Sequence, residues 1–185
     1  MRIIAGKHRS RALMTLQGDN TRPTLDQVKE SCFNKMGQYF DGGIVLDLFS
    51  GCGNIGLECI SRGFEKAVMV DINPSAVKVI QANVDMLHET SACDVICGSY
   101  TSAIQKYQGV HFDLIYIDPP YEKTDYYNES IAALLAADCI GDNTLIVLEA
   151  GKDFVFDWKR FSLQLRYEKQ YRKNKLIYLR KDNHE

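Results

Sequence analysis

The tetrapeptide Asp118-Pro119-Pro120-Tyr121 has residue types that can bind a planar amino group. Two consecutive prolines restrict the backbone and provide no N–H donors. The segment therefore presents acceptors only: the Asp118 carboxylate and the neighbouring main-chain carbonyls. These acceptors suit an –NH2 group on a ring, because its nitrogen becomes positively charged as it attacks an electrophile. Tyr121 can stack on the same ring. A rigid turn after a buried strand is the simpler interpretation.

The segment Asp47–Gly56 contains the spacing Gly-x-Gly-x-x-Gly between an expected strand and an expected helix. Glycines in this position let the chain turn tightly and let a ligand approach the main chain. A dinucleotide would place its pyrophosphate at the helix N-terminus, whereas S-adenosylmethionine has no phosphate. Asp47 favours S-adenosylmethionine, because a carboxylate there repels a pyrophosphate and attracts the ammonium group of a methionine moiety. A tight turn without a ligand remains the other interpretation.

Asp71 ends the next expected strand, 18 residues after Gly53, where a carboxylate can accept hydrogen bonds from ribose hydroxyls. Taken alone it is a weak signal, since a surface carboxylate is the alternative, and it is stronger together with the glycine loop. Ligands of parallel sheets bind beyond the carboxyl ends of the strands. Asp47, Asp71 and Asp118 all stand at such ends, so we expect them to converge in one crevice.

Alternating patterns predict the elements that position these residues. Two short strands around a basic turn are expected in residues 1–15, and Thr24 is expected to cap a helix, with Gln27 three residues later. The strands that follow are expected at 44–48, 67–70, 94–96, 112–117, 144–149, 161–170 and 175–180, with helices ending near 62 and spanning 74–88, 100–106 and 126–137. This order predicts a parallel sheet covered on both faces, with antiparallel pairing at one edge.

The length of 185 residues fits one globular domain. With 45% apolar and 25% charged residues, the composition excludes a disordered chain, a collagen and a coiled coil. The longest apolar runs are too short to cross a bilayer, and the first residues contain no signal-peptide core, so the cytoplasm is expected. Six cysteines without a Cys-x-x-Cys pair favour reduced thiols over a metal site or disulfides.

Charge is distributed unevenly along the chain. Residues 1–22 have a net charge of +4 and residues 151–181 of +7, while residues 41–150 have a net charge of −11. Basic ends indicate a polyanionic partner. Aromatic residues alternate with bases near the C-terminus, as on a surface that binds nucleic acid. Basic strands that only solvate the fold, with the aromatics buried, are the alternative.

The order Asp-Leu-Phe-Ser-Gly-x-Gly, Val-Asp and Asp-Pro-Pro-Tyr resembles the class I S-adenosylmethionine-dependent methyltransferases that act on exocyclic amines of nucleobases. The start Met-Arg-Ile-Ile-Ala-Gly-Lys-His-Arg-Ser-Arg, with Thr21-Arg22-Pro23-Thr24 and Phe33-Asn34, is similar to the RsmD-type family, which methylates guanine N2 in 16S ribosomal RNA. The resemblance covers nearly the whole chain. It implies a Rossmann-like α/β fold with a mostly parallel seven-stranded sheet, helices on both faces and an antiparallel edge pair. Residues 1–22 would form a basic β-hairpin extension and residues 23–185 the methyltransferase domain.

The resemblance also implies roles for individual residues. Asp118, Pro119 and Tyr121 would hold the target guanine. S-adenosylmethionine would be bound by Arg22, Thr24, Asp47, Phe49, Ser50, Gly51, Gly53, Asp71, Ile72 and Ser99. Within that set, Asp71 would accept from the ribose and Ile72 would lie against the adenine. RNA would be held by Arg2, Lys7, Arg9 and Arg11. The implied partner is 16S rRNA or an assembling small ribosomal subunit, with no metal and no membrane.

Three positions depart from the family pattern. Ser99 follows Gly98 where the family often has an acidic residue near the adenine amine. Arg172 follows Tyr171 where glycine is common, and Gln27 and Lys29 stand where arginines are usual. The first departure concerns the adenine contact, and the other two concern RNA affinity.

Other functions remain open from the sequence. The same chemistry could act on adenine N6 in DNA or RNA, or on a glutamine side chain of a protein. The basic N-terminal segment favours RNA over protein. A nicotinamide-dependent oxidoreductase and a non-catalytic RNA-binding protein are more distant alternatives.

Overall fold

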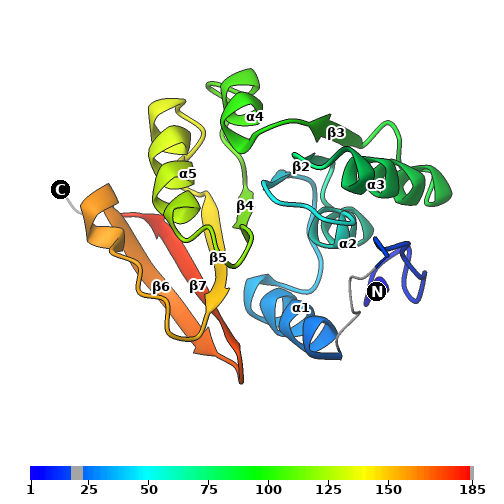
Figure 1. The fold of residues 1–185 in the computed structure, drawn as a ribbon, viewed down its shortest axis with the longest axis horizontal. Helices are drawn as coiled ribbons and strands as arrows, with labels where there is room; N and C mark the ends of the chain where they lie inside the picture. The colour runs from blue at the N-terminus through cyan, green and yellow to red at the C-terminus, as the bar shows by residue number, and fades with distance from the viewer. Residues whose placement is uncertain (18–22, 184–185) are drawn as a thin grey trace. The chain divides into compact units, whose positions relative to one another are not determined.

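The computed structural model describes residues 1–17 and 23–183. The chain divides into two compact units, Met1–Ser99 and Tyr100–Glu185. Figure 1 traces the chain through both. The domain boundary expected at residue 22 lies in the segment 18–22, outside the described residues.

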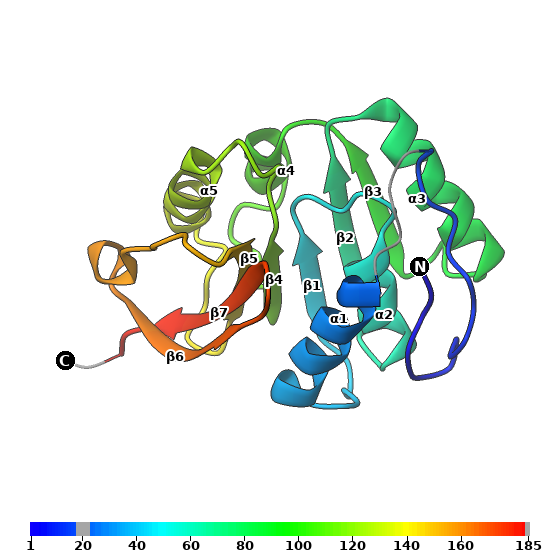
Figure 2. The same ribbon diagram turned by 60° about the horizontal axis from the view of Figure 1, so that its bottom comes forward.

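The first unit alternates helices and parallel strands. Its elements are α1 (Pro23–Met36), β1 (Ile44–Asp47), α2 (Asn54–Ser61), β2 (Lys66–Asp71), α3 (Pro74–Met86) and β3 (Cys93–Cys97). The strands lie in the order β3-β2-β1, and both pairs are parallel. Figure 2 shows them side by side, with α2 packed on β1 and β2. Every residue from Ala67 to Val70 is fully buried, as expected of a strand covered on both faces.

Local sequence signals explain where two of these helices begin. The Asn73 side chain accepts a hydrogen bond from Ser75 N (2.9 Å), and Pro74 occupies the first helical position of α3. Helix α1 begins at Pro23, so Thr24 is its second residue and the prediction that Thr24 caps the helix is wrong. Proline is favoured at the first position of a helix, because its missing N–H has no partner there.

The N-terminal segment forms a hairpin with one antiparallel bridge, between Arg2 and Ala12. The two strands expected in residues 1–15 are thus reduced to this bridge. The turn that joins them binds α2 instead of extending the ladder: Lys7 N donates to Ser61 O (2.9 Å) and His8 N to Ser61 Oγ (3.0 Å).

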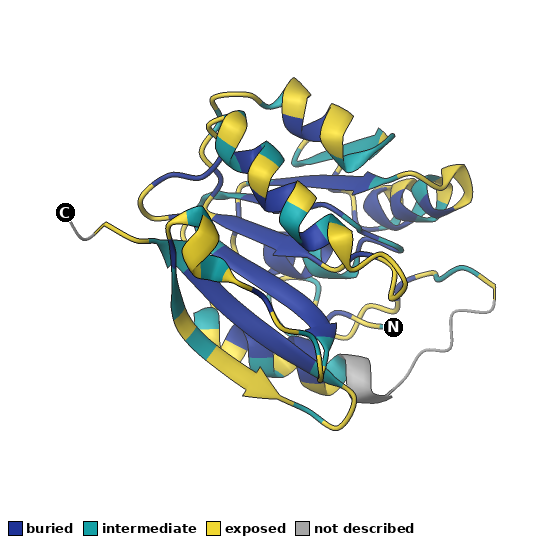
Figure 3. Ribbon diagram, turned by 60° about the vertical axis from the view of Figure 1, so that its left-hand side comes forward, coloured by how far each residue is buried: buried dark blue, intermediate teal, exposed yellow. Residues whose placement is uncertain are grey.

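The second unit combines a parallel pair with an antiparallel hairpin. Its elements are α4 (Tyr100–Lys106), β4 (Leu114–Ile117), α5 (Asp125–Ala136), β5 (Leu145–Gly151), the 3-10 turn η1 (Trp158–Phe161), β6 (Leu163–Gln170) and β7 (Asn174–Lys181). The strand order is β4-β5-β7-β6, with β4 and β5 parallel and β7 antiparallel to both of its neighbours. The expected antiparallel pair is confirmed, whereas η1 was not predicted. Strand β6 is the outer strand and is largely exposed (Figure 3).

All six cysteines lie in the described residues, and all are free. Cys32, Cys52, Cys59 and Cys139 are buried, and only Cys97 is exposed. Burial raises the pKa of the half-buried Cys93 thiol to about 12.

Candidate functional site

The glycine loop between β1 and α2 is held by its own backbone. Ser50 N donates to Val70 O (2.8 Å) and Gly53 N donates to Ser50 O (2.8 Å). The Ser50 hydroxyl donates to Asp47 O (3.1 Å), which ties the loop to the end of β1. The loop is therefore a fixed turn between a buried strand and a helix, which is the context that the sequence predicts.

The three glycines of the loop have different surroundings. A Cβ on Gly51 (φ +59°) would meet no atom within 4 Å, so the backbone there faces open space. A Cβ on Gly53 (φ +84°) would lie 3.2 Å from Met69 Sδ, and one on Gly56 only 2.6 Å from Met69 Cγ. Gly53 and Gly56 thus let α2 pack closely on β2, and Gly51 leaves room for a ligand.

Asp71, at the end of β2, joins the glycine loop directly. Its Oδ2 accepts from Gly51 N (2.9 Å) and its Oδ1 from Asn73 N (2.9 Å). An ionised carboxylate has about four acceptor positions, so further hydrogen bonds to ligand hydroxyls remain available. Ile72 follows with 73% of its surface exposed, which is unusual for isoleucine. A carboxylate beside an exposed apolar side chain fits a ribose joined to an adenine.

The other predicted cofactor residues of the first unit lie around this pair. Asp47 is only 2% exposed and Ser50 7% exposed, so both stand mostly behind the loop. Phe49 and Ser99 are half-buried, and Gly98 N, before Ser99, donates to Asp71 O (3.0 Å). Of these residues, Phe49 and Ser99 are partly accessible, whereas Asp47 and Ser50 are mostly covered. Arg22 lies outside the described residues, as does the side chain of Thr24.

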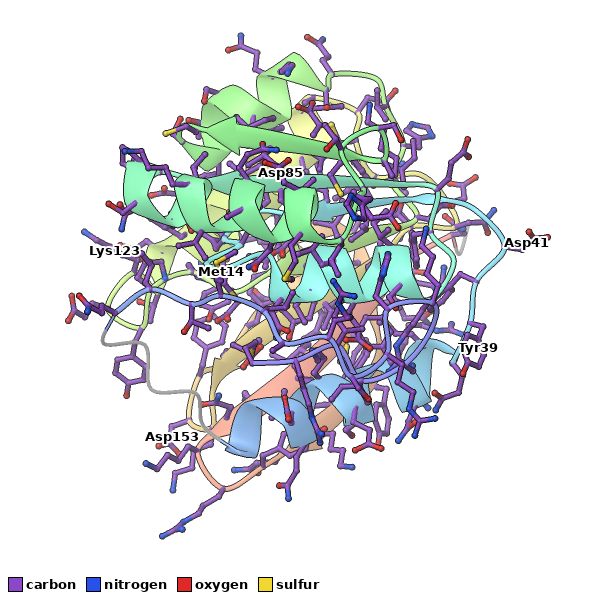
Figure 4. The ribbon with its side chains drawn as sticks, turned by 90° about the vertical axis from the view of Figure 1, so that its right-hand side faces the viewer. Met14, Tyr39, Asp41, Asp85, Lys123 and Asp153 are labelled. Carbon is purple, nitrogen blue, oxygen red and sulfur yellow. The ribbon has the colours of Figure 1, made fainter. Side chains whose placement is uncertain are left out.

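The fully buried Asn83 of α3 connects the N-terminal arm to the glycine loop. Its Oδ1 accepts from Met14 N (2.8 Å), and its Nδ2 donates to Met14 O (3.0 Å) and Cys52 O (2.9 Å). Figure 4 shows Met14 beside α3. The sequence analysis missed Asn83, because its partners lie 31 and 69 residues away.

Three charged side chains form a buried cluster beneath the N-terminal hairpin. Glu58 Oε2 lies 3.0 Å from Lys29 Nζ and Glu58 Oε1 lies 2.8 Å from Arg62 Nε. Burial lowers the pKa of Lys29, although the Glu58 carboxylate opposes this shift. Lys29 is 1% exposed, so its side chain is not available for direct contact with RNA, and an effect of this position on RNA affinity stays a prediction.

The same cluster reaches both the hairpin and the glycine loop. Glu58 accepts from Ile4 N (3.0 Å) and Ala5 N (3.1 Å). Lys29 Nζ donates to Arg2 O (2.5 Å) and to Asn54 Oδ1 (2.7 Å), and Asn54 is the first residue of α2. The N-terminal arm, which carries the basic residues, is therefore attached to α2, the helix that follows the glycine loop.

The four predicted RNA-binding residues are exposed on this arm: Arg2, Lys7, Arg9 and Arg11. Arg2 pairs with Asp26 (3.4 Å) and Lys7 with Glu89 (2.5 Å), but their side chains remain 64% and 56% exposed. Burial works against ionisation of Glu89, yet hydrogen bonds from Lys7 and His8 lower its pKa overall. The arm is a basic surface whose shape is fixed by backbone contacts.

The acceptor segment predicted to bind an amine follows β4 in the second unit. Asp118 and Pro120 are exposed, Pro119 is buried, and Tyr121 is 88% exposed. Pro120 O accepts from Lys123 N (2.8 Å), which closes a turn. The Tyr121 ring passes the end of β5: a Cβ built on Gly151 would lie 3.4 Å from Tyr121 Cε2. The exposed carboxylate and ring are thus held on a stiff turn.

A buried polar network supports this turn. Glu149 accepts from Tyr116 Oη (2.5 Å) and Asn174 Nδ2 (3.3 Å), while its main-chain O accepts from Tyr127 Oη (2.7 Å). Burial raises the pKa of Glu149, although the hydrogen bonds from Tyr116 and Asn174 oppose the shift. Burial, with the charges of Asp118 and Glu149, raises the pKa of Tyr127, so Tyr127 stays a neutral donor.

The described residues contain neither a membrane-spanning helix nor a cluster of metal ligands. In residues 1–17 and 23–183 no helix is both long and apolar enough to cross a bilayer. No group of three or more His, Cys, Asp or Glu side chains that could hold a metal ion is found in the same ranges.

The parallel strands, the glycine turn after β1 and the carboxylate that ends β2 define a Rossmann-like α/β fold, which solved methyltransferase structures share. The family model described as conserved hypothetical protein 95 matches residues 1–180. The chain therefore belongs to this family, the RsmD family of methyltransferases.

Individual relatives agree with this assignment. The ribosomal RNA small subunit methyltransferase D of Haemophilus influenzae is 32% identical over 83% of this chain and 80% of its own length. The protein of the same name from Escherichia coli K12 is 29% identical over 81% of this chain and 74% of its own length. The solved structure of yhhF from Escherichia coli is 25% identical, covers 98% of both chains and has a TM-score of 0.82.

Proposed function

We propose that this enzyme transfers a methyl group from S-adenosylmethionine to the exocyclic N2 amine of a guanine in 16S ribosomal RNA. The observation that carries the proposal is the acceptor turn at Asp118–Tyr121, with Asp118 and Tyr121 exposed, in a chain whose first unit leaves open space within 4 Å of a Cβ at Gly51. Relatives named ribosomal RNA small subunit methyltransferase D support the RNA substrate.

The acceptor residues act on the amine before and during transfer. The Asp118 carboxylate and the main-chain carbonyl of Pro119 would accept the two N2–H groups, which favours a pyramidal nitrogen with an available lone pair. Stacking of the base on Tyr121 is worth about 1–3 kcal/mol and would hold the guanine in place. When bound, S-adenosylmethionine would supply the methyl group to the amine lone pair, and the sulfur would leave as the neutral thioether of S-adenosylhomocysteine. The Asp118 carboxylate stabilises the positive charge that develops on nitrogen, and the released proton goes to water.

The cofactor would be held by the first unit. Asp71 would accept from the ribose hydroxyls, Ile72 would cover the adenine, and Ser99 would lie near the adenine amine. The methionine part would lie along the loop, bound by Asp47, Phe49, Ser50, Gly51 and Gly53. Arg22 and Thr24 would close over the cofactor. Most of the rate would come from positioning, which can supply on the order of 7–11 kcal/mol.

The RNA would be gripped by the basic N-terminal arm, through Arg2, Lys7, Arg9 and Arg11. The partner would be 16S rRNA or the small subunit during its assembly, in the cytoplasm. Because a paired or stacked guanine hides its amine, the base must be exposed before it reaches Asp118.

The decisive experiment replaces Asp118 with alanine. We expect Asp118→Ala to abolish methylation of 16S rRNA and to leave the dissociation constant of S-adenosylmethionine nearly unchanged, since the cofactor residues belong to the first unit. Glu122→Ala is the matched control, because it removes an exposed carboxylate four residues away. Methylation by Asp118→Ala at a rate similar to wild type would falsify the assigned role.

The acceptor itself is tested by competition. Labelled S-adenosylmethionine is supplied with naked 16S rRNA, assembling subunits, DNA and protein, and the labelled product is mapped. Label at guanine N2 of the rRNA supports the proposal. Label on adenine N6 or on glutamine would assign the same chemistry to another amine.

A further inference from the structure

The turn between β6 and β7 carries a concentrated positive charge. Residues 169–173 read Lys-Gln-Tyr-Arg-Lys, with three bases and no acid, a net charge of +3. Lys169, Arg172 and Lys173 are exposed. Arg172 occupies the position where glycine is common in the family pattern described above, and it adds one of these three charges.

The turn is stiff enough to keep these charges in place. Tyr171 N donates to Asn174 O (2.7 Å), which closes the turn, and Lys169 Nζ lies 5.3 Å from the centre of the Tyr171 ring. Behind it, Glu168 pairs with the largely buried Lys175 (3.5 Å). A charge on such a turn loses less entropy on binding than one on a mobile tail.

Contacts within the second unit place this turn beside the acceptor turn. Lys173 O accepts from Lys152 N (3.0 Å), and Asn174 is the strand partner of Gly151. Gly151 in turn faces the Tyr121 ring, whose Cε2 would lie 3.4 Å from a Cβ at that position. The two turns therefore flank the same end of β5.

The acceptor turn alone would repel RNA. Residues 118–125 contain Asp118, Glu122 and Asp125 against Lys123, which gives three acids and one base, a net charge of −2. A phosphate chain that delivers a base to Asp118 meets this negative charge. The +3 of the neighbouring turn, with the exposed Lys152, more than offsets it.

We propose that Lys152, Lys169, Arg172 and Lys173 bind the phosphodiester backbone of the RNA next to the nucleotide that Asp118 and Tyr121 hold. This second RNA contact, separate from the N-terminal arm, rests on the proposed function. It neutralises the phosphates that flank the target base, and it carries no sequence information of its own.

The test is the double variant Arg172→Ala/Lys173→Ala, assayed on 16S rRNA or small subunits over a range of salt concentrations. We expect KM for RNA to rise about tenfold or more, with kcat and the dissociation constant of S-adenosylmethionine unchanged. Each lost phosphate contact should also reduce the slope of log affinity against log salt by about 0.7–0.9.

The matched control is Lys159→Ala/Arg160→Ala, which removes the same charge from exposed residues of η1, before the opposite end of β6. We expect the control to change KM and the salt slope much less. An unchanged KM and salt slope in the Arg172/Lys173 variant, or an equal effect of the control, would overturn the inference. A wild-type protein that methylates no RNA would instead overturn the proposed function.

Discussion

At the scale of single residues, the glycine loop separates ligand binding from packing. Gly51 has open space where a side chain would start, and its N–H is held by Asp71. Gly56 has the side chain of Met69 in that place. Gly51 therefore leaves space beside the backbone, and Gly56 permits close packing of α2 on β2. The spacing Gly-x-Gly-x-x-Gly alone does not distinguish these two roles.

Alanine at these two positions should separate the two roles. Gly51→Ala keeps the N–H bond to Asp71 but puts a methyl group into the ligand space, so we expect the dissociation constant of S-adenosylmethionine to rise at least about tenfold. Its positive φ costs about 1–2 kcal/mol of stability. Gly56→Ala should cost about 1–3 kcal/mol through its clash with Met69 and leave the affinity unchanged. Calorimetric titration measures the dissociation constant of S-adenosylmethionine, and urea unfolding measures the stability. Equal affinities in the two variants would contradict the assignment of different roles to Gly51 and Gly56.

At the scale of elements, the Glu58 cluster fixes the N-terminal hairpin to α2. The hairpin has one bridge of its own, and its backbone is bound by Glu58, Lys29 and Ser61 among other partners. A short hairpin is marginal by itself in water, so its position depends on these buried partners.

Removing the charge of Glu58 should therefore be costly. Glu58→Gln leaves Lys29 and Arg62 buried without their counter-charge, for which we expect a loss of about 3–5 kcal/mol in unfolding free energy. Amide hydrogen exchange at Ile4 and Ala5 should also accelerate, because their N–H groups lose a charged acceptor. Glu30→Gln, at an exposed position of α1, is the control and should change neither. Normal protection at Ile4 in Glu58→Gln would show that the hairpin is held by other contacts.

The sequence predicts the helices and strands better than it predicts the buried side chains that bind distant parts of the backbone. The strands and helices follow from local periodicity, and Asp71 and the glycines follow from their positions at strand ends. Lys29 and Asn83 could not be identified in this way, because each acts on backbone atoms far away in the chain. A buried lysine has no local signature, since its solvation depends on the folded neighbours Glu58 and Asn54.

At the scale of the whole molecule, charge is divided along the chain: residues 1–22 and 151–181 are basic, and residues 41–150 have a net charge of −11. Glu149 belongs to this acidic part; its side chain is buried, and burial raises its pKa. Stability should therefore depend on pH through this group.

The sign of that dependence follows from the raised pKa. The folded protein keeps the proton of Glu149 above pH 4.5, where the unfolded chain begins to lose it, so this contribution to stability is lost as pH rises toward the folded pKa. We expect Glu149→Gln to gain stability relative to wild type as pH rises from 4.5. Urea unfolding at several pH values measures the difference, with Glu122→Gln, at an exposed position, as control. A difference that is flat with pH would contradict the prediction.

Four of the six cysteines are buried and Cys93 is half-buried, which has a practical consequence. Cys97 is the exposed thiol among six, and it ends β3 immediately before Gly98, whose N–H is bound by Asp71 O. A maleimide dye should attach there first in the native enzyme, without any cysteine being removed by mutation. The fluorescence of the dye would then report binding of the nucleoside part of S-adenosylmethionine in real time. The dye would be attached next to Gly98, the residue that donates to Asp71 O.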